Sequence, residues 1–289
     1  MNLNWPETDD LLHAVQQAML PGMLAAAVTF GLVRAVAGQR LSPLAGALAM
    51  AAGMATANYF RGTIPFDLTD SKRLLWLLPL VGLVVELVAR LPRVTAPAGW
   101  VLRTQTALVA AWLLTPRPLH EQSLVIVLVI ANLMLLLWAL GTTLTEQLPG
   151  SEVPLALAAL LNGVGWVVLY AAHYASLADW AVICGAATLG VALVAWCGKS
   201  PASGVVPVFA LMGPGLLVRA YPEVTNNRQL ICYAALALGC AALALLLIPK
   251  VGSPRPQRLT VLRASLLILL PLLTACLLTM VFEDTPEDE

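Results

Sequence analysis

Residues 123–145 read SLVIVLVIANLMLLLWALGTTLT and contain no acidic or basic side chain. An α-helix rises about 1.5 Å per residue and the hydrocarbon core of a bilayer is about 30 Å thick, so about 20 apolar residues span it. This stretch is long enough to do so. It therefore predicts a transmembrane helix and indicates an integral membrane protein.

Further apolar segments follow the same pattern along the chain. They cover residues 14–36, 41–60, 74–91, 97–114, 153–172, 177–197, 205–218, 230–248 and 261–282. Two of them are weaker candidates: Arg103 interrupts 97–114, and 205–218 contains Pro207 and Gly213-Pro214-Gly215. Either could be re-entrant or broken. The sequence predicts an all-α, polytopic transmembrane bundle of about ten helices, with a range of about eight to ten.

The composition agrees with this class. Of 289 residues, 60% are hydrophobic and only 11% are charged, and the mean hydropathy is +0.84. Soluble domains carry about 25% charged residues. The connections between segments are short, so we expect residues 1–289 to form a single membrane domain without a soluble domain. The formal net charge is zero, which gives no reason to expect nucleic acid as a partner.

The basic residues indicate an orientation. With ten helices, one side of the membrane receives Arg34, Arg40, Arg90, Arg93, Arg103, Lys199, Lys250, Arg255, Arg258 and Arg263, and the other side receives the remaining bases. The positive-inside rule places the richer side in the cytoplasm. We therefore expect a multi-pass protein of the cell membrane, of the bacterial inner-membrane type, with both termini outside.

The length and the predicted helix number are similar to those of small drug and metabolite transporters built from two five-helix halves. The similarity is one of size and helix number, and no sequence motif carries it. The outside termini inferred above differ from the inside termini that are usual in that family. We infer no membership from it.

One candidate substrate site lies in segment 153–172, where Asn162, Gly163 and Gly165 fall near the midpoint. An amide and two glycines can loosen a helix and present polar groups in hydrocarbon. Leu20-Pro21-Gly22 is a second expected interruption, in the corresponding helix of the other half, and paired interruptions point to a midplane site. The alternative is that both are packing kinks.

Two further polar residues lie within apolar segments. Glu86 is the only acid well inside one, which favours a proton or cation relay, whereas Arg90 at i+4 favours a simple ion pair. Asn132 is expected to form an interhelical hydrogen bond. We include Glu86 and Asn132 among the candidate substrate-binding residues.

A polar loop precedes segment 74–91. Its Arg61, Asp67 and Asp70 could hold a headgroup or a polar substrate on the outside. Alternatively, the loop caps the next helix and pairs its own charges. In segment 41–60 the small residues Ala45, Ala49, Gly53 and Ala57 recur every four positions and predict a close helix contact.

Nothing in the sequence indicates a catalytic residue, a cofactor or a metal site. Nucleophile-elbow, P-loop and GxGxxG motifs are absent, and the three histidines and five cysteines lack metal-ligand spacing. We expect a transporter or permease for a small, neutral or amphiphilic solute. The alternatives are a non-catalytic membrane subunit or scaffold, and an enzyme acting on lipid-linked substrates. Expected partners are membrane lipids, a small solute, and a second copy or another membrane subunit.

Overall fold

The computed structural model describes residues 15–37, 42–61, 77–116, 124–148, 150–172, 175–198, 203–223, 227–245 and 273–278. Within these ranges the chain is helical apart from its connections, and no strand occurs. The prediction of an all-α protein is confirmed.

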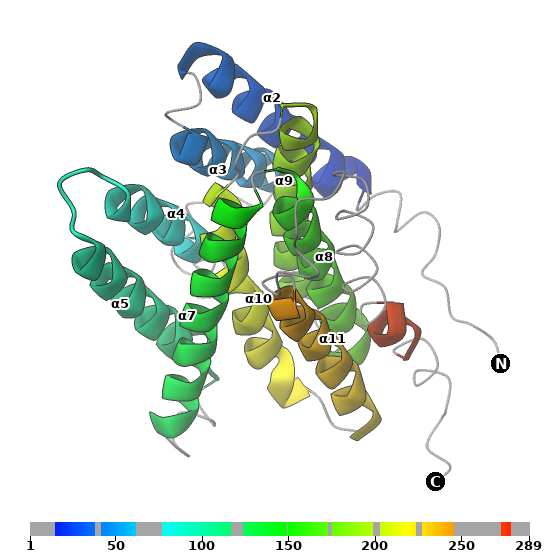
Figure 1. The fold of residues 1–289 in the computed structure, drawn as a ribbon. Coiled ribbons are helices and arrows are strands. Elements are labelled where there is room, and N and C mark those ends of the chain that lie inside the picture. Colours follow the sequence, from blue (N-terminus) through cyan, green and yellow to red (C-terminus); the bar gives the residue numbers. More distant parts are fainter. Residues whose placement is uncertain are drawn as a thin grey trace, which may run out of the picture.

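Helices occupy the predicted apolar segments (Figure 1). In chain order they are the π-helix η1 (Val15–Met19), α2 (Leu20–Ala37), α3 (Ser42–Phe60), α4 (Leu77–Ala89), α5 (Ala96–Leu114), α7 (Leu124–Gln147), α8 (Glu152–Ala172), α9 (Ala175–Gly198), the 3-10 turn η4 (Ser203–Val205), α10 (Val206–Ala220), the 3-10 turn η5 (Tyr221–Glu223) and α11 (Asn227–Leu245). Residues 273–278 are also helical, and the rest of the predicted segment 261–282 lies outside the described residues.

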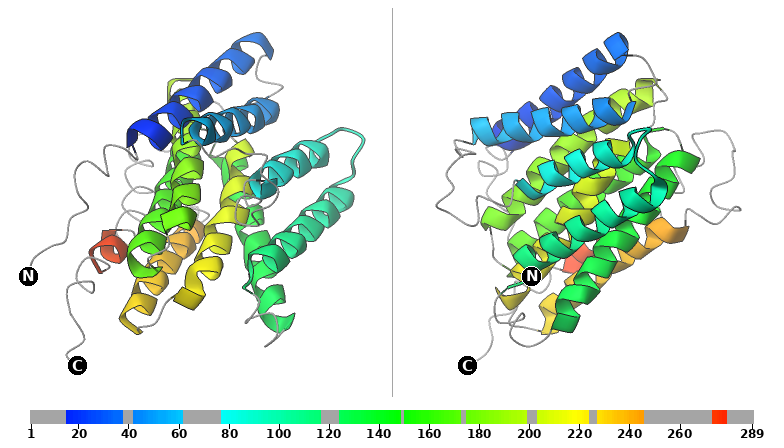
Figure 2. Two further views of the ribbon diagram at one scale, coloured as in Figure 1. Left: turned by 180° about the vertical axis from the view of Figure 1, so that it is seen from behind. Right: turned by 90° about the vertical axis from the view of Figure 1, so that its left-hand side faces the viewer.

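Three of the described helices are long and apolar enough to cross a membrane. They are α7 over Leu124–Gln147, α8 over Glu152–Tyr170 and α9 over Ala175–Cys197. Shorter apolar stretches occur in α2, α3, α4, α10 and α11. These lengths support association with a membrane, whereas a bundle of about ten spans stays a prediction. Seen from the side, the helices run broadly along one direction (Figure 2).

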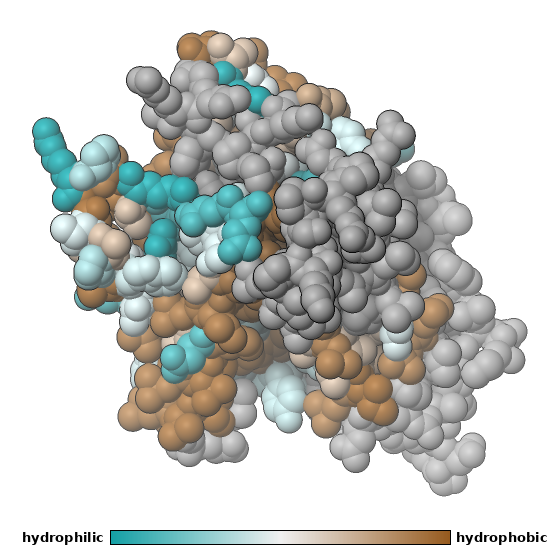
Figure 3. All heavy atoms as spheres, in the orientation of Figure 1, coloured by the Kyte–Doolittle hydropathy of each residue, from teal (hydrophilic) through white to brown (hydrophobic). Residues whose placement is uncertain are grey.

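The outer surface of the helices is apolar. On α2, large apolar side chains at every fourth position are exposed: Leu20, Leu24, Val28, Leu32 and Val36. The outer faces of α5 and α7 are similar, and Figure 3 shows a hydrophobic band over both, with hydrophilic residues gathered near the α4–α5 connection. A helix in water would bury such faces, so this surface fits a lipid environment.

Small residues bring α2, α3 and α9 together. Ala49 and Ala57 of α3 are fully buried. A Cβ atom added to Gly53 would lie 2.8 Å from the carbonyl oxygen of Gly22 and 2.9 Å from the Cβ of Ala187. No side chain fits there, because the helix backbones already touch. The predicted stripe on α3 is therefore confirmed as a helix contact within the bundle.

Helix α10 lies in the interior, between α7 and α8 (Figure 1), and it also contacts α4, α5 and α9. Every residue from Val206 to Leu216 is buried. The helix continues through Gly213-Pro214-Gly215, so the break suggested by the sequence does not occur. Pro214 lacks an N–H, however, and cannot donate to the carbonyl of Ala210 one turn earlier.

Candidate functional site

Glu86 provides a buried carboxylate within the apolar bundle. It lies in the last turn of α4 and its side chain is only 2% exposed. Its Oε1 accepts a hydrogen bond of 2.6 Å from the Nε of Arg90, whose side chain is 27% exposed. The ion pair predicted from the i, i+4 spacing is confirmed.

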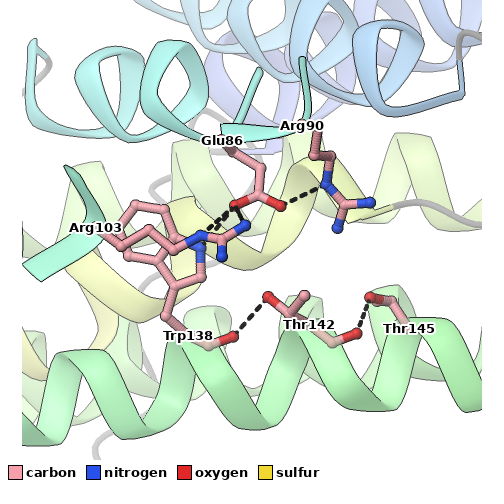
Figure 4. A network of polar contacts seen from close by, with 6 residues as sticks. All are labelled: Glu86, Arg90, Arg103, Trp138, Thr142 and Thr145. Atoms are coloured by element: carbon pink, nitrogen blue, oxygen red, sulfur yellow. Dashed lines mark hydrogen bonds and ion pairs between the residues drawn. The ribbon is translucent and has the colours of Figure 1, made fainter. Parts of the chain in front are cut away.

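The second carboxylate oxygen of Glu86 accepts hydrogen bonds from side chains of two more helices (Figure 4). The Nε and Nη2 of Arg103, in α5, lie 3.1 and 3.0 Å from the Oε2 of Glu86. The indole N–H of Trp138, in α7, donates to the same oxygen at 2.9 Å. We call Glu86, Arg90, Arg103 and Trp138 the Glu86 cluster. One carboxylate thus links α4, α5 and α7.

Close helix packing builds this cluster. A Cβ on Gly99 would lie 3.2 Å from the Cβ of Ala89, so the glycine lets the start of α5 approach the end of α4. The helices are joined by only Arg90–Thr95, where the chain turns back at Pro92. The short connection keeps Arg103 and Glu86 on neighbouring helices.

The ion pairs and hydrogen bonds of the Glu86 cluster offset the unfavourable free energy of burying charged groups. Trp138 is fully buried and the Arg103 side chain is 9% exposed, so both groups have lost their water. A charge in such surroundings persists only when it is paired and hydrogen-bonded, and charge-assisted bonds are about twice as strong as neutral ones. Arg103 also stacks over the ring of Trp100, 4.7 Å from its centroid.

The side of α7 beside the cluster carries two hydroxyl groups (Figure 4). Thr142 donates to the carbonyl of Trp138 at 2.8 Å, and Thr145 donates to the carbonyl of Thr142 at 2.8 Å. Both side chains are buried. Because their protons are bound within the helix, the hydroxyl oxygens remain able to accept a hydrogen bond.

The cluster has an unbalanced charge. Within the part of the chain that the structure describes, it contains two guanidinium groups, from Arg90 and Arg103, and one carboxylate, from Glu86. Its net charge is therefore positive. Such a centre attracts an anion and repels a free cation.

The other candidate residues of the apolar segments lie elsewhere. Asn162 donates to the carbonyl of Ala158 within α8 at 2.8 Å and packs against Gly185 of α9. A Cβ on Gly165 would lie 3.0 Å from Val182, and Gly163 is buried. The predicted loosened turn is not seen, because α8 is continuous through these residues. Asn162 and Gly165 lie in the contact between α8 and α9.

Near the second expected interruption the helix type changes. The π-helix η1 ends at Met19 and α2 begins at Leu20, so Pro21 occupies the first turn of the α-helix. Pro21 has no N–H to donate, and it lies where π-helical bonding gives way to α-helical bonding.

The structure places Asn132 on the exposed face of α7. Its Nδ2 donates to the carbonyl of Leu128, in the same helix, at 2.8 Å. Within the described chain this bond lies inside α7, so the hydrogen bond to another helix stays a prediction. The position of Asn132 along the helix can be predicted from the sequence, but the face of the helix on which it lies cannot.

Of the three loop candidates, the structure describes Arg61. It forms an ion pair with Asp179 of α9, which ties the ends of α3 and α9 together. Asp67 and Asp70 lie outside the described residues. The ion pair therefore holds Arg61 against a helix.

Sequence reasoning missed two members of the cluster, Arg103 and Trp138. A signal existed for Arg103, because a base inside an apolar segment needs an acid and Glu86 is the nearest on the adjacent helix. No comparable signal marked Trp138, since its indole N–H finds Glu86 only through tertiary packing.

The described residues contain no group of three or more His, Cys, Asp or Glu side chains that suits a metal ion. No protein-family model matches this chain, and a comparison with curated proteins finds no similar one.

Proposed function

We propose that this chain is a multi-span membrane protein that moves a small solute across the bilayer, with the Glu86 cluster as its polar centre. The observation that carries the proposal is the burial of the Glu86 carboxylate and the Arg103 guanidinium, with Arg90 partly buried beside them, inside an otherwise apolar helix bundle. Ionisable residues at membrane depth are rare and concentrate along solute and ion pathways.

The depth of the cluster supports this role. Trp138 lies nine positions before Gln147, the end of α7. At about 1.5 Å per residue the separation is about 14 Å, whereas the half-thickness of the hydrocarbon core is about 15 Å. If α7 spans the bilayer, the indole of Trp138 lies within hydrocarbon, and Glu86 reaches this depth from the last turn of α4.

The positive charge of the cluster favours a solute that carries a carboxylate or a phosphate. Composition alone suggested a neutral or amphiphilic solute, because so few charges were available. The two guanidinium groups around Glu86 alter this expectation, since a planar guanidinium binds an oxyanion in a bidentate manner. Arg90 is the more accessible of the two.

Helix α10 supplies an element that can change shape beside the cluster. It contacts α4, α5 and α7, which are the helices that carry Glu86, Arg103 and Trp138. Proline and glycine residues within buried membrane helices weaken the backbone hydrogen bonding locally and allow bending. A shift of α10 would repack all three helices around the charge.

The experiment is uptake by the purified protein in liposomes. The labelled probes are acetate, succinate and inorganic phosphate, with glucose and choline as neutral and cationic comparisons. We expect saturable uptake of at least one anion and a fall of roughly tenfold in Arg90→Gln, a factor that corresponds to about 1.4 kcal/mol. Arg93→Gln, an exposed base on the same connection, is the matched control. Non-saturable uptake of all five probes contradicts the proposal.

A second candidate function is that of a membrane subunit or scaffold. The favouring observation is that both oxygens of Glu86 already bind protein donors, so the cluster also serves as a structural tie. This role predicts stable co-purification with another membrane chain from native membranes. It also predicts that Arg90→Gln changes stability without any change in flux.

A further inference from the structure

The outer face of α7 carries an amide in the middle of an apolar surface. Asn132 is exposed, and so are the large apolar side chains around it: Leu128, Val129, Leu133 and Leu136 are between 43% and 63% exposed. The opposite face of the helix, with Ala131, Met134 and Trp138, is buried in the bundle.

This placement is unfavourable if only lipid covers the helix. One proton of the Asn132 amide binds the carbonyl of Leu128. The second proton and the carbonyl oxygen of the side chain remain, and an acyl chain offers neither a donor nor an acceptor. A carboxamide in hydrocarbon therefore gains stability from a polar group on another helix.

Asn132 belongs to a stripe of residues, here called the seam, whose spacing is typical of two helices packed side by side. Val125, Val129, Asn132, Leu136, Ala139 and Thr143 follow one another at alternating intervals of four and three. Five of these six residues are exposed, and the sixth, Ala139, is partly exposed. An average interval of 3.5 keeps one stripe facing a partner helix in a left-handed pair, and a single polar residue in the stripe fixes the register.

From these observations we propose that α7 is a dimer interface, at which a second copy of this chain packs its own α7 and its own Asn132 against the first. An amide is both donor and acceptor, so two copies related by a two-fold axis satisfy each other. This self-complementarity favours a second copy over a different protein. Ala139 is small, and the Thr143 hydroxyl donates within its own helix, so both allow close approach.

This inference requires that α7 lies in the bilayer but does not depend on solute transport. The test is single-molecule photobleaching of the labelled full chain in liposomes over a range of protein-to-lipid ratios. We expect dimers for the unchanged protein. In Asn132→Leu, the dissociation constant should rise roughly tenfold, equivalent to about 1.4 kcal/mol. Asn132→Gln should largely preserve the dimer, because it retains the amide.

Leu133→Ala is the matched control, since Leu133 is exposed on the same helix but lies off the seam. A second seam variant, Val129→Trp, keeps Asn132 and should separate the copies by steric hindrance. A monomeric protein at all ratios overturns the proposal. So does dimerisation of both Asn132→Leu and Val129→Trp with unchanged affinity.

Discussion

The indole N–H of Trp138 donates to the Oε2 of Glu86 at 2.9 Å, although the two residues are 52 positions apart in the chain. The same oxygen accepts from Arg103. Helices α4, α5 and α7 therefore share one buried acceptor, and the loss of any member of the cluster should affect all three.

Removing the Glu86 charge should destabilise the fold strongly. Glu86→Gln has nearly the same size but leaves the buried Arg103 without its counter-charge, and breaking a buried pair costs about 3–5 kcal/mol. Thermal unfolding of the protein in lipid nanodiscs measures the effect. Glu146→Gln, in the exposed last turn of α7, is the control and should be close to neutral. Equal unfolding temperatures for the two variants would count against a structural role for the charge.

Replacing Trp138 tests the hydrogen bond separately from the packing. Trp138→Phe keeps an aromatic ring but removes the indole N–H, and a hydrogen bond to a charged group contributes about 1.5–3 kcal/mol. Residues in one network show interaction energies of about 0.5–3 kcal/mol in a double-mutant cycle. The cycle that combines Trp138→Phe with Glu86→Gln should give a value in this range, whereas additive effects would mean that the two side chains do not interact.

Two glycines in adjacent elements should respond differently to the same change. A Cβ on Gly53 would lie within 2.9 Å of three atoms of neighbouring helices, so Gly53→Ala should cost about 1–3 kcal/mol through overpacking. A Cβ on Gly31 would lie 3.9 Å from Val194, an ordinary contact. Because alanine is the better helix former by up to about 1 kcal/mol, Gly31→Ala should be neutral or stabilising. Chemical unfolding in mixed micelles compares the two, and similar destabilisation of both would contradict the close contact at Gly53.

Restoring a backbone hydrogen bond in α10 should make the protein more stable and less active. Pro214→Ala returns the N–H that the carbonyl of Ala210 lacks, and a proline inside a helix costs about 3 kcal/mol relative to alanine. We expect a higher unfolding temperature together with slower uptake, because α10 would bend less easily. Increased stability with unchanged uptake would mean that bending of α10 plays no part in transport.

Much of the fold could be predicted from the sequence, because helix ends follow local rules. The segment predicted at 97–114 is observed as Ala96–Leu114. Thr95 precedes the helix in an extended conformation and Pro97 fits its first turn. Pro116 disfavours a helical conformation at Thr115, which is extended. Helix α7 extends two residues further than the predicted 123–145, since Glu146 and Gln147 are good helix formers.

The candidate site could be predicted only in part. The pair of Glu86 and Arg90 follows from spacing within one helix. The contribution of Trp138 depends on how α7 is rotated about its axis, and a helix that is apolar on all sides carries no moment that fixes this rotation. The same ambiguity hid the direction of Asn132, whose side chain faces outward.

The central claim is that these helices lie in lipid and that α7 crosses the bilayer. The most direct measurement is spin-label accessibility at single cysteines introduced along Leu124–Gln147, in liposomes and with the native cysteines replaced. We predict frequent collisions with oxygen and few with a water-soluble nickel complex at the exposed Leu128 and Leu133, and low values for both reagents at the buried Met134. Frequent collisions with the nickel complex along the whole of α7 would contradict the account.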